Sequence, residues 1–234
     1  MAFLPAAGGR LGWARGALGA LIGIAVAGVL TRFLAQSVVQ AGLPGLASPG
    51  LPWLVAPLGA AAVLVFAVPA SPLAQPWPVV GGNLISAAVG LAAGHWLAEP
   101  WLAASLGVGC AIALMALARC LHPPGGACAL LCALGAGANG WGWSFLLMPL
   151  APNVLVLAAS GWLYNRLTGH PWPHHPAPPP ALPRDTWAGT YDIADLDAVL
   201  AEWDEVLDID REDLDALFRA LERRVQARWE SARQ

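Results

Sequence analysis

The chain has 234 residues, of which 57% are hydrophobic and only 12% carry a charge. Residues 1–184 hold one carboxylate, Glu99, against six arginines, whereas residues 185–234 hold 14 carboxylates against six arginines. The first part therefore has a formal charge of +5 and the tail −8, which together give the net charge of −3. This distribution indicates a membrane body followed by an acidic soluble tail, and it argues against a nucleic-acid-binding protein.

The first apolar segment follows Arg10 and Arg15, as it would in a secretory signal peptide. It runs from Gly16 to about Leu30, and further apolar segments follow it instead of a soluble domain. We therefore expect an uncleaved first transmembrane helix.

A transmembrane helix needs roughly 20 mainly apolar residues. Five segments come near that length, at about 15–35, 51–69, 78–98, 101–119 and 143–165. A sixth, 124–138, is shorter and fits either a thin span or a half helix that turns back inside the protein. The sequence thus predicts an all-α, polytopic transmembrane helix bundle over residues 1–168, with about six spans of which the fifth is short or half-spanning.

Basic residues are retained on the cytoplasmic side of a membrane, so the arginines predict the orientation. Six spans with a cytoplasmic N-terminus put Glu99 outside and leave Arg32 as the one arginine on the wrong side. The arginines then found inside are Arg10, Arg15, Arg119, Arg166 and Arg184. We expect a multi-pass membrane protein with both termini in the cytoplasm.

The tail begins with a proline-rich stretch, residues 169–189, that predicts an extended linker. Residues 190–234 contain two amphipathic patterns, which predict an acidic helical hairpin in the cytoplasm. Each helix has an apolar face that needs burial, against the membrane body or a sister subunit. We therefore expect a homo-oligomer.

Two segments combine prolines with a pair of glycines: residues 75–83, the first proline–glycine segment, and residues 119–126, the second. Pro123 and Pro124 predict the start of a new helix, because proline suits the first helical turn. In transporters, segments of this kind can mark broken helices whose positive N-termini face an anion. The alternative is ordinary close packing of helices through small residues.

His122 is the histidine of the second segment, and imidazole titrates near physiological pH. It either binds an anion or carries a coupled proton, or it caps a helix by hydrogen bonding to a carbonyl. Arg119 either supplies positive charge at the mouth of an anion path or snorkels to the interface. The candidate substrate-binding residues are His122, Arg119, Pro123, Gly125, Gly126, Gln75, Gly81, Gly82 and Asn83.

No pattern indicates an enzyme, a cofactor or a metal site. Cys128 and Cys132 are four residues apart without a C-x-x-C pair, and buried cysteine usually behaves as a small hydrophobe. His170, His174 and His175 lie in the proline-rich linker, where a loose surface site is the alternative to plain exposed residues.

The run His122-Pro123-Pro124-Gly125-Gly126-Ala127 resembles the signature of the HPP family of integral membrane proteins. Ser71 to Pro76 followed by Gly81-Gly82-Asn83 resembles that family's second recurrent segment, and Trp162 to Asn165 a third. The tail resembles the segment that joins the membrane region to paired CBS domains in many bacterial members, so the resemblance implies a member lacking those domains. It also implies a transporter, with nitrite as the solute associated with plastid and cyanobacterial relatives.

The residues themselves favour an anion over a cation, since arginines are available and the predicted membrane core lacks carboxylates. We therefore expect a transporter or channel for a small monovalent anion such as nitrite. The alternative is a non-transporting membrane scaffold whose acidic tail binds a regulatory partner.

Overall fold

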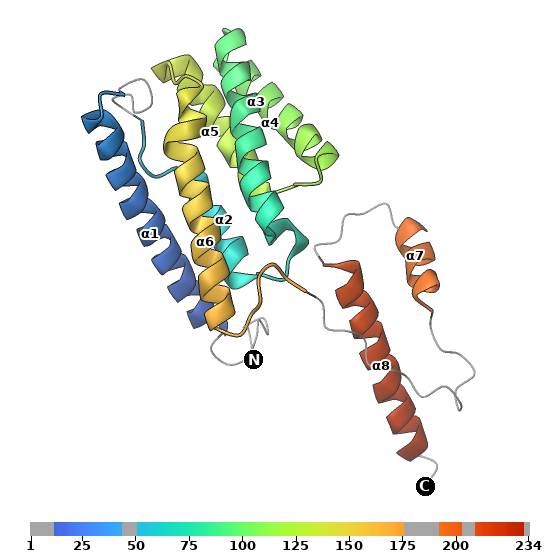
Figure 1. The fold of residues 1–234 in the computed structure, drawn as a ribbon. Helices are drawn as coiled ribbons and strands as arrows, with labels where there is room; N and C mark the ends of the chain where they lie inside the picture. Colours follow the sequence, from blue (N-terminus) through green and yellow to red (C-terminus); the bar gives the residue numbers. More distant parts are fainter. Residues whose placement is uncertain (1–11, 44–50, 176–191, 203–208, 232–234) are drawn as a thin grey trace, which may run out of the picture. The chain divides into compact units, whose positions relative to one another are not determined.

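A computed structural model describes residues 12–43, 51–175, 192–202 and 209–231 of the chain (Figure 1). It divides into two compact units, Met1–His174 and His175–Gln234. The described residues of both units form helices and connecting segments, without a β-strand.

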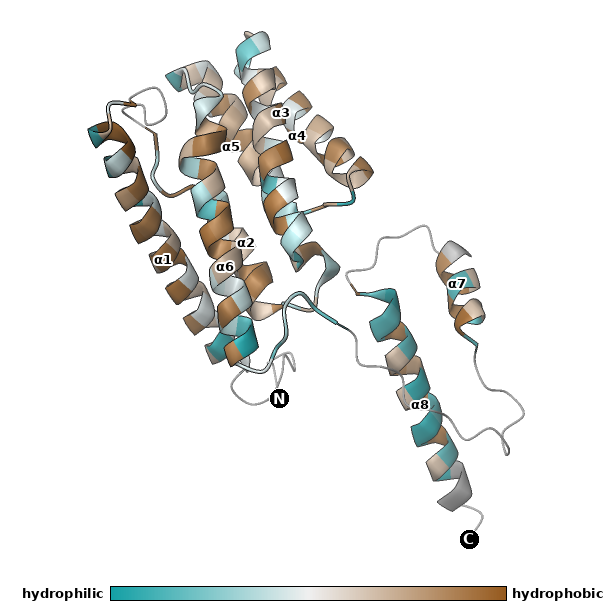
Figure 2. Ribbon diagram, in the orientation of Figure 1, coloured by the Kyte–Doolittle hydropathy of each residue, from teal (hydrophilic) through white to brown (hydrophobic). Residues whose placement is uncertain are grey.

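In its described residues, the first unit is a bundle of six α-helices with three short helical segments between them (Figure 1). The α-helices are α1 (Gly12–Gln40), α2 (Pro57–Ala67), α3 (Asn83–Trp96), α4 (Pro100–Leu117), α5 (Pro123–Asn139) and α6 (Ala151–Leu167). The short segments are η2 (Pro72–Ala74), η3 (Pro78–Gly82) and η4 (Leu146–Leu150). Figure 2 shows that apolar residues dominate these helices, as expected of a bundle that faces lipid.

Four stretches of the described residues are helices long and apolar enough to cross a membrane: Gly12–Gln40, Pro78–Trp96, Pro100–Leu117 and Leu146–Leu167. They confirm four of the predicted spans. The other two are shorter, because α5 has 17 residues and α2 only 11. At 1.5 Å per residue, α2 extends about 16 Å, roughly half of the hydrocarbon thickness. The fifth predicted span is therefore short, as expected, and the second, for which nearly full length was predicted, is shorter still.

The second predicted span is short because the backbone before α2 is irregular and is stabilised by another helix. The side chain of Asn153 accepts a hydrogen bond from Val55 N at 3.0 Å and donates to Trp53 O at 3.0 Å. It also donates to the hydroxyl of Thr31 at 2.9 Å, and both Asn153 and Thr31 are buried. Irregular backbone inside a membrane protein requires such partners, since lipid offers none.

α3 and α5 pack so closely that their backbones touch. A Cβ atom added to Gly90 would lie 2.2 Å from the carbonyl oxygen of Ala129, and one on Gly94 2.2 Å from that of Ala133. Gly82, Ser86, Gly90 and Gly94 recur every four residues, so they share one face of the η3–α3 helix. Small residues at this spacing let membrane helices approach each other, which is the packing alternative that the glycine pairs suggested.

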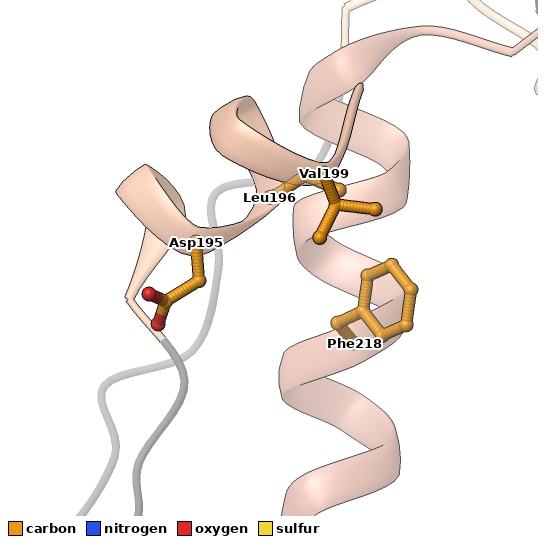
Figure 3. A pocket seen from close by; sticks show the side chains of 4 residues that line it. All are labelled: Asp195, Leu196, Val199 and Phe218. Atoms are coloured by element: carbon orange, nitrogen blue, oxygen red, sulfur yellow. The ribbon is translucent and has the colours of Figure 1, made fainter. Parts of the chain in front are cut away.

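The second unit contains α7 (Ile193–Glu202) and α8 (Arg211–Ser231). Arg211 forms an ion pair with Asp197, which joins the start of α8 to α7. Asp195, Leu196 and Val199 of α7 also line a small apolar pocket with Phe218 of α8 (Figure 3). The expected burial of both apolar faces is incomplete, because Leu217 and Leu221 on α8 are 58% and 56% exposed.

Candidate functional site at the two proline–glycine segments

His122 occupies the position immediately before α5, in extended backbone conformation. Pro123 and Pro124 form the first turn of that helix, which confirms the predicted helix start. The imidazole of His122 is completely buried, and its Nδ1 atom lies 2.9 Å from the carbonyl oxygen of Leu73. The ring therefore bonds to a carbonyl of a different segment and does not cap its own helix.

The other ring nitrogen of His122 has no hydrogen-bond partner. A carbonyl oxygen only accepts hydrogen bonds, so Nδ1 carries the hydrogen that points to Leu73 O. In the neutral ring, Nε2 then presents a lone pair, and this buried atom is unpartnered. An unpaired buried polar atom costs stability, and such atoms are rare in folded proteins.

Asn83, the last residue of the first proline–glycine segment, has the same property. Its amide nitrogen donates to Val79 O at 2.8 Å, whereas its buried Oδ1 atom has no partner. The structure thus leaves one polar atom unsatisfied in each of the two segments.

The two segments contact each other through one glycine from each pair. A Cβ atom on Gly82 would lie 2.6 Å from the Cβ of His122 and 2.8 Å from Cys120 O. One on Gly125 would lie 2.6 Å from the hydroxyl oxygen of Ser86 and 3.1 Å from Gly82 O. Both positions need glycine because the opposite backbone or a buried side chain occupies the space that a side chain would fill.

The second glycine of each pair lies elsewhere. A Cβ atom on Gly81 would lie 3.0 Å from the ring of Trp77, whereas one on Gly126 would have no atom within 4 Å. Pro123 is exposed and lines an apolar groove on the α2–α5 side of the bundle. Arg119 is also exposed, in the left-handed backbone conformation with φ of 53° that ends α4. The structure therefore brings together His122, Gly82 and Gly125, whereas Asn83 directly follows Gly82 in the chain.

Gln75 is fully engaged by the protein. Its amide nitrogen donates to Pro69 O at 3.0 Å and to Ser71 O at 2.8 Å, and its Oε1 accepts from the backbone nitrogen of His174 at 2.8 Å. Its amide shapes the segment that carries Leu73 O, the acceptor for His122. Its role in binding a solute stays a prediction.

The sequence interpretation missed a support for this site from the end of the bundle. Trp172 is buried, and its indole nitrogen donates to Ala74 O at 3.0 Å. With His174, it holds the chain after α6 against residues 71–75, although both residues belong to the predicted proline-rich linker. A tryptophan among prolines was the available signal, because a buried indole needs an acceptor for its N–H group.

A second missed residue is Arg15, whose predicted role concerned orientation alone. Its guanidinium donates to the side-chain oxygen of Asn165 at 2.8 Å and to Phe66 O, at the end of α2, at 2.7 Å. Tyr164 in turn donates to Arg15 O at 2.8 Å. The third recurrent segment, Trp162 to Asn165, thus joins α6 to α1 and α2.

The described residues contain no group of three or more side chains that could hold a metal ion. Cys128 and Cys132 are buried on α5. These positions fit helix packing.

The family profile described as HPP, transmembrane region, matches residues 5–173. The chain belongs to the HPP family. Two curated relatives are transmembrane proteins of Dictyostelium discoideum, each 36% identical to this chain, over 116 and 117 residues. These alignments cover 48% of this HPP protein and 41% and 38% of the relatives, so the chain spans about two fifths of their length. No solved structure matches the chain.

Proposed function

We propose that this HPP-family membrane protein is a transporter or channel for a small monovalent anion, with nitrite as the solute by family analogy. The observation that carries the proposal is the buried imidazole of His122, which is oriented by Leu73 O and keeps one ring nitrogen without a partner. A residue retained only for packing has no need of a polar atom, and a polar atom kept unsatisfied costs stability. The arrangement therefore suits a site that a solute completes.

The charge of the bundle supports an anion. The described part of the first unit contains four arginines and a single carboxylate, Glu99. A positive field raises the local concentration of anions, and cation paths generally rely on carboxylates or rings of carbonyls. The start of α5 beside His122 adds the positive end of a helix dipole.

We further propose, by analogy with bacterial members of the family, that the protein lies in a bacterial inner membrane. The distribution of arginines supports an orientation with both termini in the cytoplasm. The second proline–glycine segment then faces the cytoplasmic half of the bundle. A homo-oligomer stays a prediction.

The test is uptake of nitrite, nitrate, formate and chloride into liposomes that contain the purified protein. We expect saturable uptake of nitrite above protein-free liposomes. The variant His122→Asn should lose this uptake, whereas His95→Asn should keep it, because His95 is an exposed histidine at the end of α3. Absence of uptake for all four anions, with folded protein inserted in the membrane, would contradict the proposal.

The second candidate function is a membrane scaffold whose acidic tail binds a partner. It is favoured by the exposed apolar side chains of Leu217 and Leu221 on α8, which a partner would bury. Truncation after Arg184 separates the two functions. If the bundle is a transporter, the truncated protein should still transport. If the protein is a scaffold, the truncated protein should no longer bind its partner, and neither form should transport.

A further inference from the structure

The unsatisfied atoms of the two proline–glycine segments have the same hydrogen-bonding character. The hydrogen on Nδ1 of His122 is used by Leu73 O, so the free Nε2 is an acceptor in the neutral ring. The amide hydrogens of Asn83 lie on the nitrogen that donates to Val79 O, so the free Oδ1 is also an acceptor. Both side chains are 0% exposed.

A bare anion such as nitrite or chloride brings further acceptors and no donor. It leaves both atoms unsatisfied and places negative charge beside their lone pairs. A solute with an O–H group, in contrast, donates to one of them. Ammonium would also donate, but the bundle has four described arginines against one carboxylate, and this charge repels a cation.

We propose that the site takes its solute as the neutral form of a small oxygen acid, which donates its O–H group to Nε2 of His122. This inference rests on the proposed function, because it names the chemical form in which that solute occupies the site. Nitrous and formic acids belong to the class; nitrate and chloride, whose conjugate acids are strong, do not.

The acid can then transfer its proton to the ring. The O–H bond breaks, its electron pair stays on the acid oxygen, and an N–H bond forms at Nε2. The product is an imidazolium that donates from Nδ1 to Leu73 O and from Nε2 to the anion, so every hydrogen has an acceptor. Release follows by return of the proton to the anion, or by departure of the anion and then of the proton from Nε2 to the same side of the membrane, so that no net charge moves.

Among His122 and the described residues packed around it, the imidazole is the group that can accept the proton of the acid. The segments packed against it, residues 71–75 and 78–83, contain no titratable side chain. In the loop that contains His122, Cys120 is a buried free thiol, and Arg119 is exposed and carries a fixed positive charge. Neither of these groups is a base at neutral pH.

The experiment compares two solutes of similar size and equal charge, nitrite and nitrate, in liposomes that contain the full-length protein. Uptake of a neutral acid moves no net charge. We therefore expect nitrite uptake, corrected for protein-free liposomes, to acidify the lumen. Its rate should be independent of an imposed membrane potential. At fixed total nitrite it should fall about tenfold for each unit of rising pH, as the acid form does. Formate should behave likewise, and nitrate should not be taken up.

Two variants replace the ring of His122 by an amide, one at the position of Nδ1 and one at the position of Nε2. His122→Asn places an amide N–H where Nδ1 stands and removes Nε2, whereas His122→Gln places an amide at the Nε2 end. We expect both to lose proton-coupled nitrite uptake, with folding checked by gel filtration and tryptophan fluorescence. The wild-type measurements stand independently if a variant fails to fold.

Two results would overturn the inference while leaving the proposed function intact. They are equal uptake of nitrate and nitrite, or nitrite uptake that follows the imposed potential. Unchanged rate and pH dependence in folded His122→Asn would mean that Nε2 holds only a structural water. Faster uptake of methylammonium than of nitrite would assign the acceptors to a cation and would contradict the proposed function as well. Absence of uptake of every solute by the folded wild-type protein would contradict the proposed function itself.

Discussion

Replacing Gly90 by alanine tests the packing that holds the site in place. The added Cβ would lie 2.2 Å from Ala129 O and 2.9 Å from both Ala129 C and Ala129 Cα. These are backbone atoms of α5, so no side-chain rotation can relieve the contact. An ordinary contact distance near 3.4 Å requires α3 and α5 to separate locally by about 1 Å, and overpacking of this kind costs about 1–3 kcal/mol.

The matched control is Gly109→Ala in α4, where no atom lies within 4 Å of the new Cβ position. Both glycines are inside helices, so both variants gain the same helix propensity, up to about 1 kcal/mol. We expect Gly90→Ala to melt below Gly109→Ala by about 2–10 °C, from the usual shift of a few degrees per kcal/mol for a chain of this size. Thermal unfolding in detergent, followed by tryptophan fluorescence, measures the difference. Equal melting temperatures would refute the inference that backbone contact between α3 and α5 sets their separation.

Three further predictions concern side-chain interactions. Arg15→Lys should destabilise the bundle by about 1.5–3 kcal/mol, because an ammonium group cannot replace the guanidinium that joins Asn165 to Phe66 O; a melting temperature equal to wild type would contradict this. Asn153→Leu should cost about 1–3 kcal/mol for each group left without a partner, above all Val55 N, whereas Ser105→Ala, on an exposed hydroxyl, serves as a control with little effect in the same melt. In the second unit, the hydrogen bond from Arg211 lowers the pKa of Asp197, so the contribution of this pair to stability is complete above the ordinary aspartate pKa and is lost as pH falls through the lowered value. The carboxyl carbon of Asp197, followed by NMR, should titrate at higher pH in Arg211→Gln, and an unchanged midpoint would show that the pair does not form in solution.

The helical bundle could be predicted from the sequence because the apolar segments are long and prolines mark their ends. The start of α5 at Pro123 followed in the same way, since proline lacks the N–H group that a helix interior requires. The length of α2 could not be predicted, because it depends on Asn153, which lies about 100 residues away from the backbone that it stabilises. Hydropathy sums apolar character along the chain and contains no information about such a partner.

The proline–glycine segments could be located from the sequence, but the roles of their residues could not be separated. Gly125 and Gly126 are adjacent and chemically identical, yet one contacts Ser86 and the other faces open space. Their difference arises from a helical rotation of about 100° per residue relative to a neighbour whose position the sequence did not give. Trp172 was missed for a similar reason, since its acceptor belongs to a segment 98 residues earlier.

The polar side chains buried in the bundle divide into two groups, and this division identifies the candidate site. Asn153 and Asn165 use both ends of their amides in hydrogen bonds, Asn165 to α1 and α2 and Asn153 to α1 and to the irregular backbone before α2, as lipid-embedded polar groups must. Among the described residues of the first unit, the buried side-chain atoms left without a partner are Oδ1 of Asn83 and Nε2 of His122. Both lie in the proline–glycine segments, where glycine packing brings the two backbones into contact. A solute that donates a hydrogen bond would restore at this place the balance that the rest of the bundle achieves by itself.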